Sequence, residues 1–258
     1  MSKSMASGKS VKSIRASLIR HLRKWHRKLG ILAAFFLIFL SVTGIGLNHT
    51  ETLALSHQPI TSPWLLEHYG IKNPADIRFY QQKQLVITDQ YAWLGNKLLL
   101  ESPGSVLSMG KFQQYWLVLS PLQLSVYNLA GDLVDRLTTS TGLPDGITAM
   151  AITADSVIVN TSSGYYQTDE NMLGWQPITT LVTPQWLSAE QVSQQDIAEA
   201  QLRYKSQFLN LEQIVLDAHS GRIFGDLGVY FMDLVAVALI LLSLSGIYIW
   251  IRYSQAKR

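Results

Sequence analysis

A run of 23 residues near the carboxyl end of the chain, 229–251, carries a single charge, Asp233, and constrains the fold more than any other feature. A hydrocarbon core about 30 Å thick is crossed by about 20 apolar residues in a helix. Trp250 and Tyr253 stand where interfacial aromatic residues belong, and three Lys or Arg residues follow within 252–258. The run therefore predicts a transmembrane helix with a basic end.

A second stretch, 29–47, has no charged residue in 19 positions and is also long enough to cross a bilayer. It is longer than the core of a cleavable signal peptide, about 7–15 residues, and no small-residue cleavage site follows it cleanly. We therefore interpret 29–48 as an uncleaved signal anchor. The two spans leave residues 49–228 for one domain between them.

Charge is strongly segregated along the chain. Residues 1–28 hold nine Lys or Arg and no acid, whereas 49–228 hold nine basic and seventeen acidic residues. A basic tail beside a span is the usual signal for a cytoplasmic end, which we favour over a nucleic-acid-binding arm. The charges predict a bacterial inner-membrane protein with both termini cytoplasmic and the central domain periplasmic. Within the tail, 14–28 predicts a basic amphipathic helix that lies on the inner membrane surface, contacts lipids and runs into the span.

Two segments carry a family resemblance. His-Ser-Gly-Arg-Ile-Phe-Gly at 219–225 and Leu-Ser-Leu-Ser-Gly-Ile-Tyr-Ile-Trp at 242–250 are similar to the closing helix of PepSY-associated transmembrane proteins. Trp-His-Arg-Lys-Leu-Gly at 25–30, followed by Val-Thr-Gly at 42–44, resembles the opening helix of that family. The resemblance implies a bacterial cytoplasmic-membrane protein with an extracytoplasmic domain.

The resemblance also implies a functional context. Some larger relatives are thought to be haem-containing reductases in iron uptake, with about four spans where this chain has two. The segment 188–220 resembles a PepSY unit, as a helix followed by a strand and a turn before the membrane.

Between residues 76 and 178 apolar residues recur with a period of two, which indicates antiparallel β structure. Two strand pairs repeat at an offset of 41 residues, close to the roughly 40–45 residues of a propeller blade. The fold class we predict is two antiparallel transmembrane helices plus a mainly antiparallel β domain, as a partial propeller-like stack or a sandwich. The expected strands are 85–88, 91–94, 97–100, 116–120, 124–128, 133–137, 157–161 and 165–169.

Helical and extended segments are expected between the β region and the second span. Ser188-Ala-Glu-Gln191 has the form of a capping box and predicts a helix over about 188–206 that packs lightly on the sheet. Residues 211–216 are expected to form a strand that leads to a turn at 217–221.

The sequence offers little for catalysis. It contains no cysteine, which excludes disulfides, thiolate metal sites, iron–sulfur ligation and cysteine nucleophiles. It shows no nucleophile motif, phosphate loop or metal signature, and the glycines at 221, 225 and 228 have the wrong spacing for a dinucleotide fingerprint. We therefore predict no catalytic or metal-binding residues and favour a protein that is not an enzyme.

Haem is the one cofactor that the histidines suggest. His49 and His219 flank the two spans on the same side, and His26 lies at the opposite interface. Histidine imidazole is a common axial ligand of haem, so these three are the candidate ligands of a haem b. The structural interpretation is that His219 packs in the juxtamembrane turn and His26 is an interfacial polar residue. We favour the structural interpretation and expect no cofactor.

Asp233 and two groups of small residues are the remaining features of the spans. Asp233 is four residues into its span, about 6 Å from the outer end, where interfacial water, Ser or Thr side chains or Asn48 could satisfy it. A structural role is favoured over a proton or ligand role. Small residues gather near the outer end of the first span and the inner end of the second, so each group should face larger side chains of its neighbour or a second protomer. They are Ser41, Thr43, Gly44 and Gly46, and Ser243, Ser245 and Gly246.

Two classes of function remain from the sequence. The first is a membrane-anchored accessory or binding protein whose periplasmic domain holds a protein partner, with a link to iron uptake. The second is a haem-binding subunit of a membrane redox complex, as a homodimer with four helices.

Overall fold

The computed structural model describes residues 5–102, 104–169, 171–172, 174–180 and 183–255. The chain forms two compact units. The first combines the two ends of the sequence, Met1–Ile60 and Leu209–Arg258, and the second is the continuous segment Thr61–Phe208.

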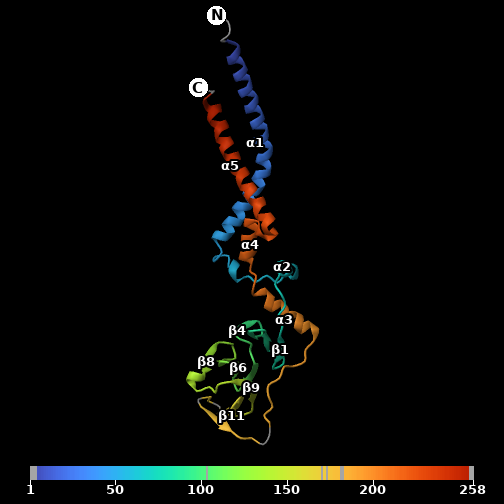
Figure 1. The fold of residues 1–258 in the computed structure, drawn as a ribbon, viewed down its shortest axis with the longest axis vertical. Helices are drawn as coiled ribbons and strands as arrows, with labels where there is room; N and C mark the ends of the chain where they lie inside the picture. The colour runs from blue at the N-terminus through green and yellow to red at the C-terminus, as the bar shows by residue number, and fades with distance from the viewer. Residues whose placement is uncertain (1–4, 103, 170, 173, 181–182, 256–258) are drawn as a thin grey trace. The chain divides into compact units, whose positions relative to one another are not determined.

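Two long helices dominate the first unit. Helix α1 (Met5–Asn48) and helix α5 (Gly225–Gln255) pack side by side in opposite directions, so the start of α1 and the end of α5 lie at the same end of the pair (Figure 1). Their apolar parts are Lys24–Asn48 and Arg222–Ile251, and only 6% of the most apolar window of each is buried. A core helix of a soluble protein would be mostly buried, so these exposed apolar helices identify a membrane protein.

Helix α1 is uninterrupted from its basic to its apolar part. The predicted surface helix at 14–28 is therefore a continuation of the span, with no break before Leu29. The physical reason lies in the composition, because this segment contains no proline and is rich in Arg, Lys and Leu, which favour helix.

The predicted strand at 211–216 is wrong, because this segment is the start of helix α4 (Leu211–Ser220). The Asn210 side chain caps the helix by accepting a hydrogen bond from the Gln213 backbone N–H at 2.9 Å. The apolar residues fall at helical rather than alternating spacing: Leu211, Ile214, Val215 and Ala218. The predicted turn at 217–221 is also wrong for its first four residues, which continue the helix, and Gly221, in the left-handed conformation at φ 81°, ends it.

The short elements of the first unit connect these helices. A 3-10 turn, η3 (Arg222–Phe224), joins α4 to α5, and another, η1 (Leu55–His57), follows α1. The chain leaving α1 pairs with the chain entering α4, because the Ile60 N–H donates to the Leu209 carbonyl at 2.9 Å and the Leu211 N–H donates to the Gln58 carbonyl at 2.9 Å. These bonds hold the two ends of the unit together.

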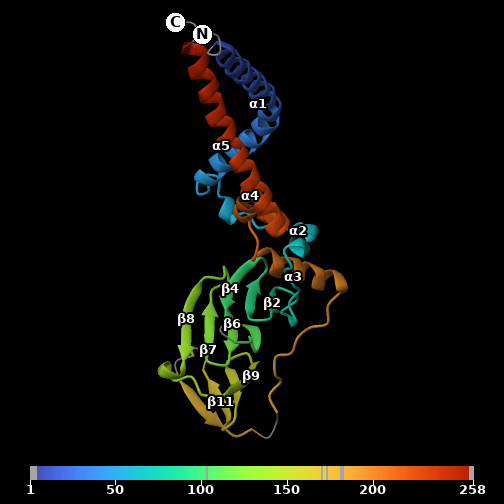
Figure 2. The ribbon, with the colours of Figure 1, turned by 45° about the horizontal axis from the view of Figure 1, so that its top comes forward.

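The second unit contains three antiparallel sheets of four strands each within the described residues (Figure 2). Each is a simple meander, ordered β1-β2-β3-β4, β5-β6-β7-β8 and β12-β11-β10-β9. The strands are β1 (Ile77–Tyr80), β2 (Leu85–Thr88), β3 (Tyr91–Leu94), β4 (Lys97–Glu101), β5 (Ser108–Phe112), β6 (Tyr115–Ser120), β7 (Gln123–Tyr127), β8 (Leu133–Thr138), β9 (Ile147–Ile152), β10 (Val157–Thr161), β11 (Gly164–Thr168) and β12 (Trp175–Ile178). A one-turn helix, α2 (Pro63–His68), precedes them, and a 3-10 turn, η2 (Thr139–Thr141), follows β8.

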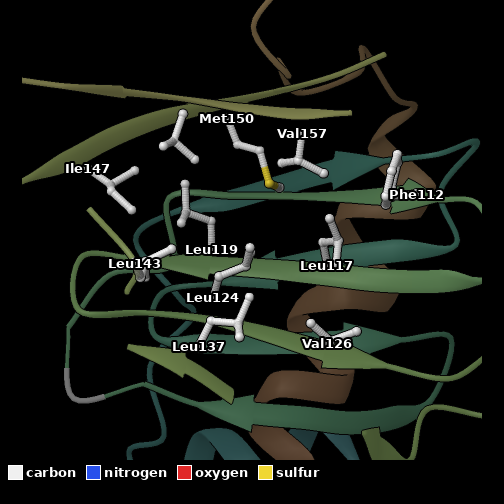
Figure 3. Packing of buried hydrophobic residues seen from close by; sticks show 11 residues of the cluster. Phe112, Leu117, Leu119, Leu124, Val126, Leu137, Leu143, Ile147, Met150 and Val157 are labelled. Carbon is white, nitrogen blue, oxygen red and sulfur yellow. The ribbon is translucent and has the colours of Figure 1, made fainter. Parts of the chain in front are cut away.

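This architecture confirms the predicted fold class. The 41-residue offset relates β6 to β10 and β7 to β11, which occupy the same places in the second and third sheets. The three sheets stack as a partial propeller-like array. The core lies between them, and in Figure 3 the side chains of Ile147, Met150 and Val157 point from the third sheet toward Leu117 and Leu119 of the second.

The chain returning from the last strand crosses the inner strands of the sheets. The Leu187 N–H donates to the Met150 carbonyl at 2.9 Å, and the Glu190 N–H donates to the Phe79 carbonyl at 2.8 Å. The Leu187 side chain packs against Gly110 of β5. A larger residue at 110 would clash with it, because a Cβ there would lie 2.7 Å from the Leu187 Cδ1 atom. The return segment thereby closes the open inner edge of the array.

Helix α3 (Gln194–Ser206) begins later than predicted, because the capping box is formed by Ser193 and Asp196 and not by Ser188 and Gln191. The Ser193 hydroxyl accepts from the Asp196 backbone N–H while the Asp196 carboxylate accepts from the Ser193 N–H. Its apolar side packs on the first sheet around Ala200, which is 1% exposed. The partners are Phe79, Val86, Tyr91, Trp93, Ile197 and Tyr204.

The capping carboxylate predicts a dependence of stability on acid pH. Hydrogen bonds from Lys83 and Ser193 lower the pKa of the Asp196 carboxyl from 3.8 to about 2. Because the pKa is lower in the folded state, this contribution is present above about pH 4 and is lost as the pH falls toward 2. We expect Asp196→Asn to flatten part of the loss of thermal stability between pH 5 and pH 2, measured as the unfolding midpoint of the full chain in detergent. An unchanged pH profile in this variant would contradict the assignment.

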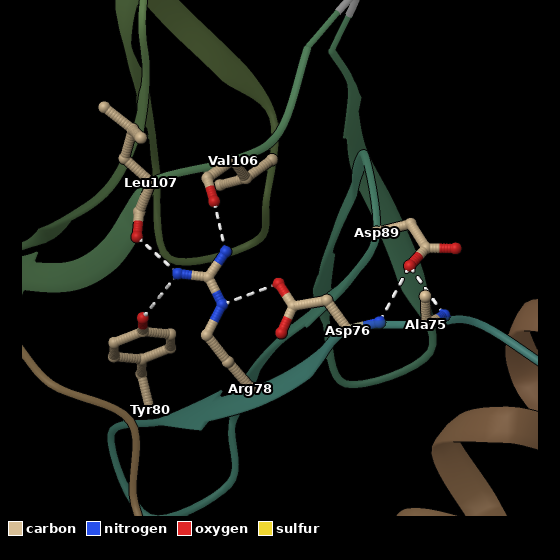
Figure 4. Close-up of polar contacts among 7 residues, drawn as sticks. All are labelled: Ala75, Asp76, Arg78, Tyr80, Asp89, Val106 and Leu107. Carbon is tan, nitrogen blue, oxygen red and sulfur yellow. Dashed lines mark hydrogen bonds and ion pairs between the residues drawn. The ribbon is translucent and has the colours of Figure 1, made fainter. Parts of the chain in front are cut away.

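One arginine joins the first sheet to the second. Arg78 on β1 donates through Nη1 to the Leu107 carbonyl at 2.6 Å and through Nη2 to the Val106 carbonyl at 2.5 Å, just before β5 (Figure 4). Its Nε donates to Asp76 at 2.8 Å. Burial raises the pKa of the neighbouring Tyr80, so this hydroxyl stays neutral beside the guanidinium. The guanidinium therefore donates to the Val106 and Leu107 carbonyls, at a place where no described strand of one sheet pairs with a strand of the other.

Candidate functional site

The α1–α5 pair holds one histidine in a contact between the helices. His26 of α1 contacts the Ser245 hydroxyl of α5, with Nδ1 and Oγ 2.9 Å apart. The Ser245 hydroxyl also lies within donating distance of the Leu242 carbonyl, at 3.0 Å, and when it donates there the His26 Nδ1–H is the donor in the shared bond. The absence of a side chain at Gly246 makes room for the ring, since a Cβ there would lie 3.2 Å from the His26 Cε1 atom.

A second histidine makes the same kind of contact at the other end of the pair. His219 of α4 lies with Nδ1 2.7 Å from the Thr43 hydroxyl of α1. The Thr43 hydroxyl also lies within donating distance of the Phe39 carbonyl, at 2.8 Å, and when it donates there the His219 Nδ1–H is again the donor. Gly44 lies under the ring, where a Cβ would be 3.7 Å from Cε1.

These contacts show that two residues of each group of small residues face a larger side chain of a neighbouring helix. Thr43 and Gly44 receive His219, and Ser245 and Gly246 receive His26. The two Thr-Gly and Ser-Gly pairs therefore act as seats for the two histidines, each offering a hydroxyl acceptor beside a space without a side chain.

The structure places the three candidate haem ligands at different points of the first unit. Thr43, which binds His219, is 17 residues from His26 along α1, or about 25 Å in a helix. His49 is exposed just beyond the end of α1. No group of three or more His, Cys, Asp or Glu side chains among the described residues is arranged to hold a metal ion.

The histidine contacts predict a loss of stability upon substitution. Replacing His219 with Ala removes a hydrogen bond between helices, which in membrane proteins contributes about 0.6 kcal/mol on average and about 1.7 at most. We expect His219→Ala and His26→Ala each to lower the thermal midpoint in detergent by a few degrees, and Thr43→Val to reproduce the first effect. His57→Ala, at an exposed position in η1, is the matched control and should leave the midpoint unchanged.

Asp233 lies on the face of α5 that points away from α1. Its neighbours Phe231 and Val235 face α1: the Phe231 ring is 5.5 Å from that of Phe36, and Val235 is buried at 8% exposure. Asp233 itself is exposed, and the described residues offer its carboxylate no hydrogen-bond or ion-pair partner. The expected contact with Asn48 is therefore not formed.

The depth of Asp233 also differs from the sequence expectation. Phe36, which contacts Phe231, is the middle residue of the apolar segment Lys24–Asn48, twelve residues or about 18 Å from either end. Asp233 is two residues from Phe231 and thus lies near the centre of the span. The sequence placed it near an end because the span was taken to begin at 229, whereas the apolar helical segment begins at Arg222.

In the second unit, a cleft of about 460 Å³ opens between the second and third sheets. One wall comes from β8, the outermost strand of its sheet, whose Val134 is 54% exposed. The other walls carry amide, hydroxyl and apolar side chains. The lining residues are Gln113, Gln114, Tyr115, Val126, Val134, Asp135, Leu137, Thr141, Asn171 and Met172.

This cleft could not be foreseen from the sequence. Its lining comes from four separate segments that only the stacking of the sheets brings together. The one local signal was Leu133 and Val134, two adjacent apolar residues in a strand whose neighbouring positions are charged, which is unusual for a solvated edge.

Comparison with known proteins gives two kinds of result. Among curated protein sequences, none matches this chain. Three solved chains resemble part of the structure and are matched over less than half of their own length. They are the N-terminal domain of Nup159 (12% identity, TM-score 0.30, 43% of this chain and 35% of that one), the Neurospora crassa Pan2 WD40 domain (14%, 0.31, 51% and 43%) and KlHsv2 with loop 6CD replaced by a Gly-Ser linker (17%, 0.27, 42% and 39%).

The family comparison covers nearly the whole molecule. The model of the PepSY-associated TM region matches residues 5–252, from the start of α1 almost to the end of α5. The match includes both histidine seats and the glycine-bearing turn between α4 and α5. The chain therefore belongs to the PepSY-associated TM region family.

Proposed function

We propose that this protein is an accessory binding protein of the bacterial envelope, anchored in the inner membrane by α1 and α5, with its β unit in the periplasm. The charge distribution supports this orientation, because the segments outside the spans at both ends are basic and the segment between the spans is acidic. Membrane lipids surround the anchor, and a protein partner occupies the periplasmic unit.

The observation that carries the proposal is the free edge of β8 beside the 460 Å³ cleft. In the described sheets β8 pairs on one side only, with β7, so its outer backbone groups are available to another extended chain. Exposed Leu133 and Val134 offer apolar contacts, while Gln113, Gln114 and Asp135 offer hydrogen bonds. These features suit an extended segment of a protein better than a compact small molecule.

Photo-crosslinking tests the binding role. A photoreactive phenylalanine analogue at Val134 should give a discrete covalent adduct with one protein in living cells, identified by mass spectrometry. The same analogue at Leu98 is the matched control, because Leu98 is also exposed on an outermost strand, β4, away from the cleft. No adduct from Val134, or equal adducts from both positions, would contradict a binding role for the cleft.

The pathway we propose is iron uptake, which rests on the resemblance to larger relatives described above. A strain lacking the protein should then grow more slowly than its parent when iron is limiting and equally well when iron is plentiful. Equal growth in both media would remove the link to iron.

The alternative function, a haem-binding subunit of a membrane redox complex, has one observation in its favour. With Nδ1–H donated to Ser245, the His26 Nε2 is left as the acceptor, which is the arrangement of many metal-binding histidines. His26 also lines a groove of about 480 Å³ between the helices, together with Gly30, Ala34 and Gly246. Haem would supply one-electron transfer there. A protein purified in mild detergent should be colourless on our account, whereas a Soret band that is lost in His26→Ala would favour the redox subunit.

A further inference from the structure

The back of α5 presents one continuous stripe of exposed residues. They recur at alternating steps of four and three, the spacing of a coiled-coil seam. Four of these side chains, those of Tyr230, Val237, Ile240 and Leu244, are between 52% and 69% exposed, and the carboxylates are exposed as well. We define the α5 stripe as Asp226, Tyr230, Asp233, Val237, Ile240 and Leu244.

The stripe carries a group that hydrocarbon does not solvate. Asp233 lies on it near the centre of the span, opposite the side that contacts α1. A carboxyl group inside a bilayer is costly unless another protein group hydrogen-bonds to it. An apolar stripe alone could face lipid, but a stripe with a carboxyl at mid-depth requires a covering helix.

We propose that the α5 stripe packs against the α5 stripe of a second copy of this chain, forming a parallel homodimer about a two-fold axis along the membrane normal. The stripe is complementary to itself in this arrangement. Asp233 occupies one seam position, so across the two-fold axis its carboxyl faces the Asp233 carboxyl of the other copy at the same depth. A protonated carboxyl of one copy donates to the carboxyl oxygen of the other, which satisfies both groups without a cation.

The charges of the span favour a second copy over a different helix. In the segment Arg222–Ile251 the one basic residue, Arg222, is at the end far from the centre, so no ion pair within the stripe covers Asp233. A different membrane protein would have to supply a buried donor of its own at matching depth. A second copy inserts in the same orientation and supplies the carboxyl of its own Asp233 at the same depth.

This inference rests on the membrane anchoring in the proposed function and names a partner for that anchor. It is independent of what the β unit binds. Failure of the dimer would leave the orientation of the chain and the crosslink from Val134 unaffected, so the two proposals can fail separately.

Disulfide crosslinking tests the proposal, because the chain contains no cysteine of its own. Ile240→Cys places a single thiol on the stripe, and Ile31→Cys places one at similar depth on the exposed face of α1; the two isoleucines are 58% and 76% exposed. In membranes treated with a mild oxidant, Ile240→Cys should form a covalent dimer and Ile31→Cys should stay monomeric. A dimer from Ile31→Cys, or none from Ile240→Cys, would overturn the proposed face.

Substitutions at Asp233 then test the polar contact within the Ile240→Cys background. Asp233→Asn keeps donor and acceptor groups and should retain the crosslink, whereas Asp233→Val should reduce its initial rate about three- to tenfold, the size of one interhelical hydrogen bond. Mass measurement in mild detergent checks the stoichiometry, and a 28.9 kDa monomer of the unmodified protein would refute the dimer. Undiminished crosslinking in Asp233→Val would refute the role of the carboxyl.

Discussion

Replacing Gly221 with Ala is expected to abolish the folded membrane unit. Gly221 ends α4 at φ 81°, and a Cβ there would overlap the Gly228 carbonyl and lie 2.6 Å from the Met232 Cγ atom. The backbone of α5 cannot move aside without losing its own hydrogen bonds. Conformational strain of about 1–3 kcal/mol and the overlap act together, so we expect destabilisation above about 4 kcal/mol. The measurement is the yield of monodisperse protein in detergent and its unfolding midpoint.

Three further glycine variants separate the two causes. Gly225→Ala isolates the strain, since Gly225 has φ 66° but no atom within 4 Å of its Cβ position. Gly228→Ala isolates the overlap, because its Cβ would meet the Gly221 carbonyl and lie 2.9 Å from the Phe224 Cβ atom. Gly46→Ala meets nothing within 4 Å and should be neutral or slightly stabilising. A Gly221→Ala protein as stable as Gly46→Ala would contradict the turn geometry.

Replacing Arg78 with Met is expected to have the second largest effect. The substitution keeps the apolar stem but leaves the Val106 and Leu107 carbonyls without these donors, so the first two sheets lose one of their polar connections. Hydrogen bonds to charged groups contribute about 1.5–3 kcal/mol each, and we expect a loss of about 3 kcal/mol for the pair. For a unit of this size that corresponds to a fall of about 6–12 °C in the unfolding midpoint. Hydrogen exchange at β1 and β5 should rise with it.

Lys97→Met provides the matched control for this result. Lys97 also joins a carboxylate and a carbonyl, Asp132 at 2.7 Å and Ala130 at 3.0 Å, but its side chain is 47% exposed and that of Asp132 65%. Surface ion pairs contribute about 0–1 kcal/mol, so the midpoint should change little. Equal effects from the two variants would mean that Arg78 has no special place between the sheets.

The periodic parts of the sequence predicted the fold well. The two spans and the central strands followed from long apolar runs and from alternation, and the 41-residue offset correctly paired β6 with β10. The strands that the sequence missed were mostly the innermost ones. β5 contains Gly110 and Lys111 and β12 contains Pro177, so neither reads as an alternating strand, although sheet stacking makes both of them strands.

The remaining misassignments share a cause, which is the choice between helix and strand in short apolar segments. Ile214-Val215-Leu216 resembles a strand locally, but the Asn210 cap and the packing of the segment against α1 make it helical. The site was harder to predict than the fold. His26 and His219 were recognised as candidates, yet the small residues that receive them lie more than 170 positions away in the sequence, and contacts of that range follow from packing alone.

The central claim is that a periplasmic β unit is held by an anchor whose ends are cytoplasmic, and thiol labelling tests it most directly. In this chain without cysteine, Ser163→Cys places one thiol on the exposed turn between β10 and β11, and Ser10→Cys places one in the basic tail. In spheroplasts, a membrane-impermeant maleimide should label Ser163→Cys fully and Ser10→Cys only after lysis. Labelling of Ser10→Cys in intact spheroplasts, with Ser163→Cys protected until lysis, would contradict the account.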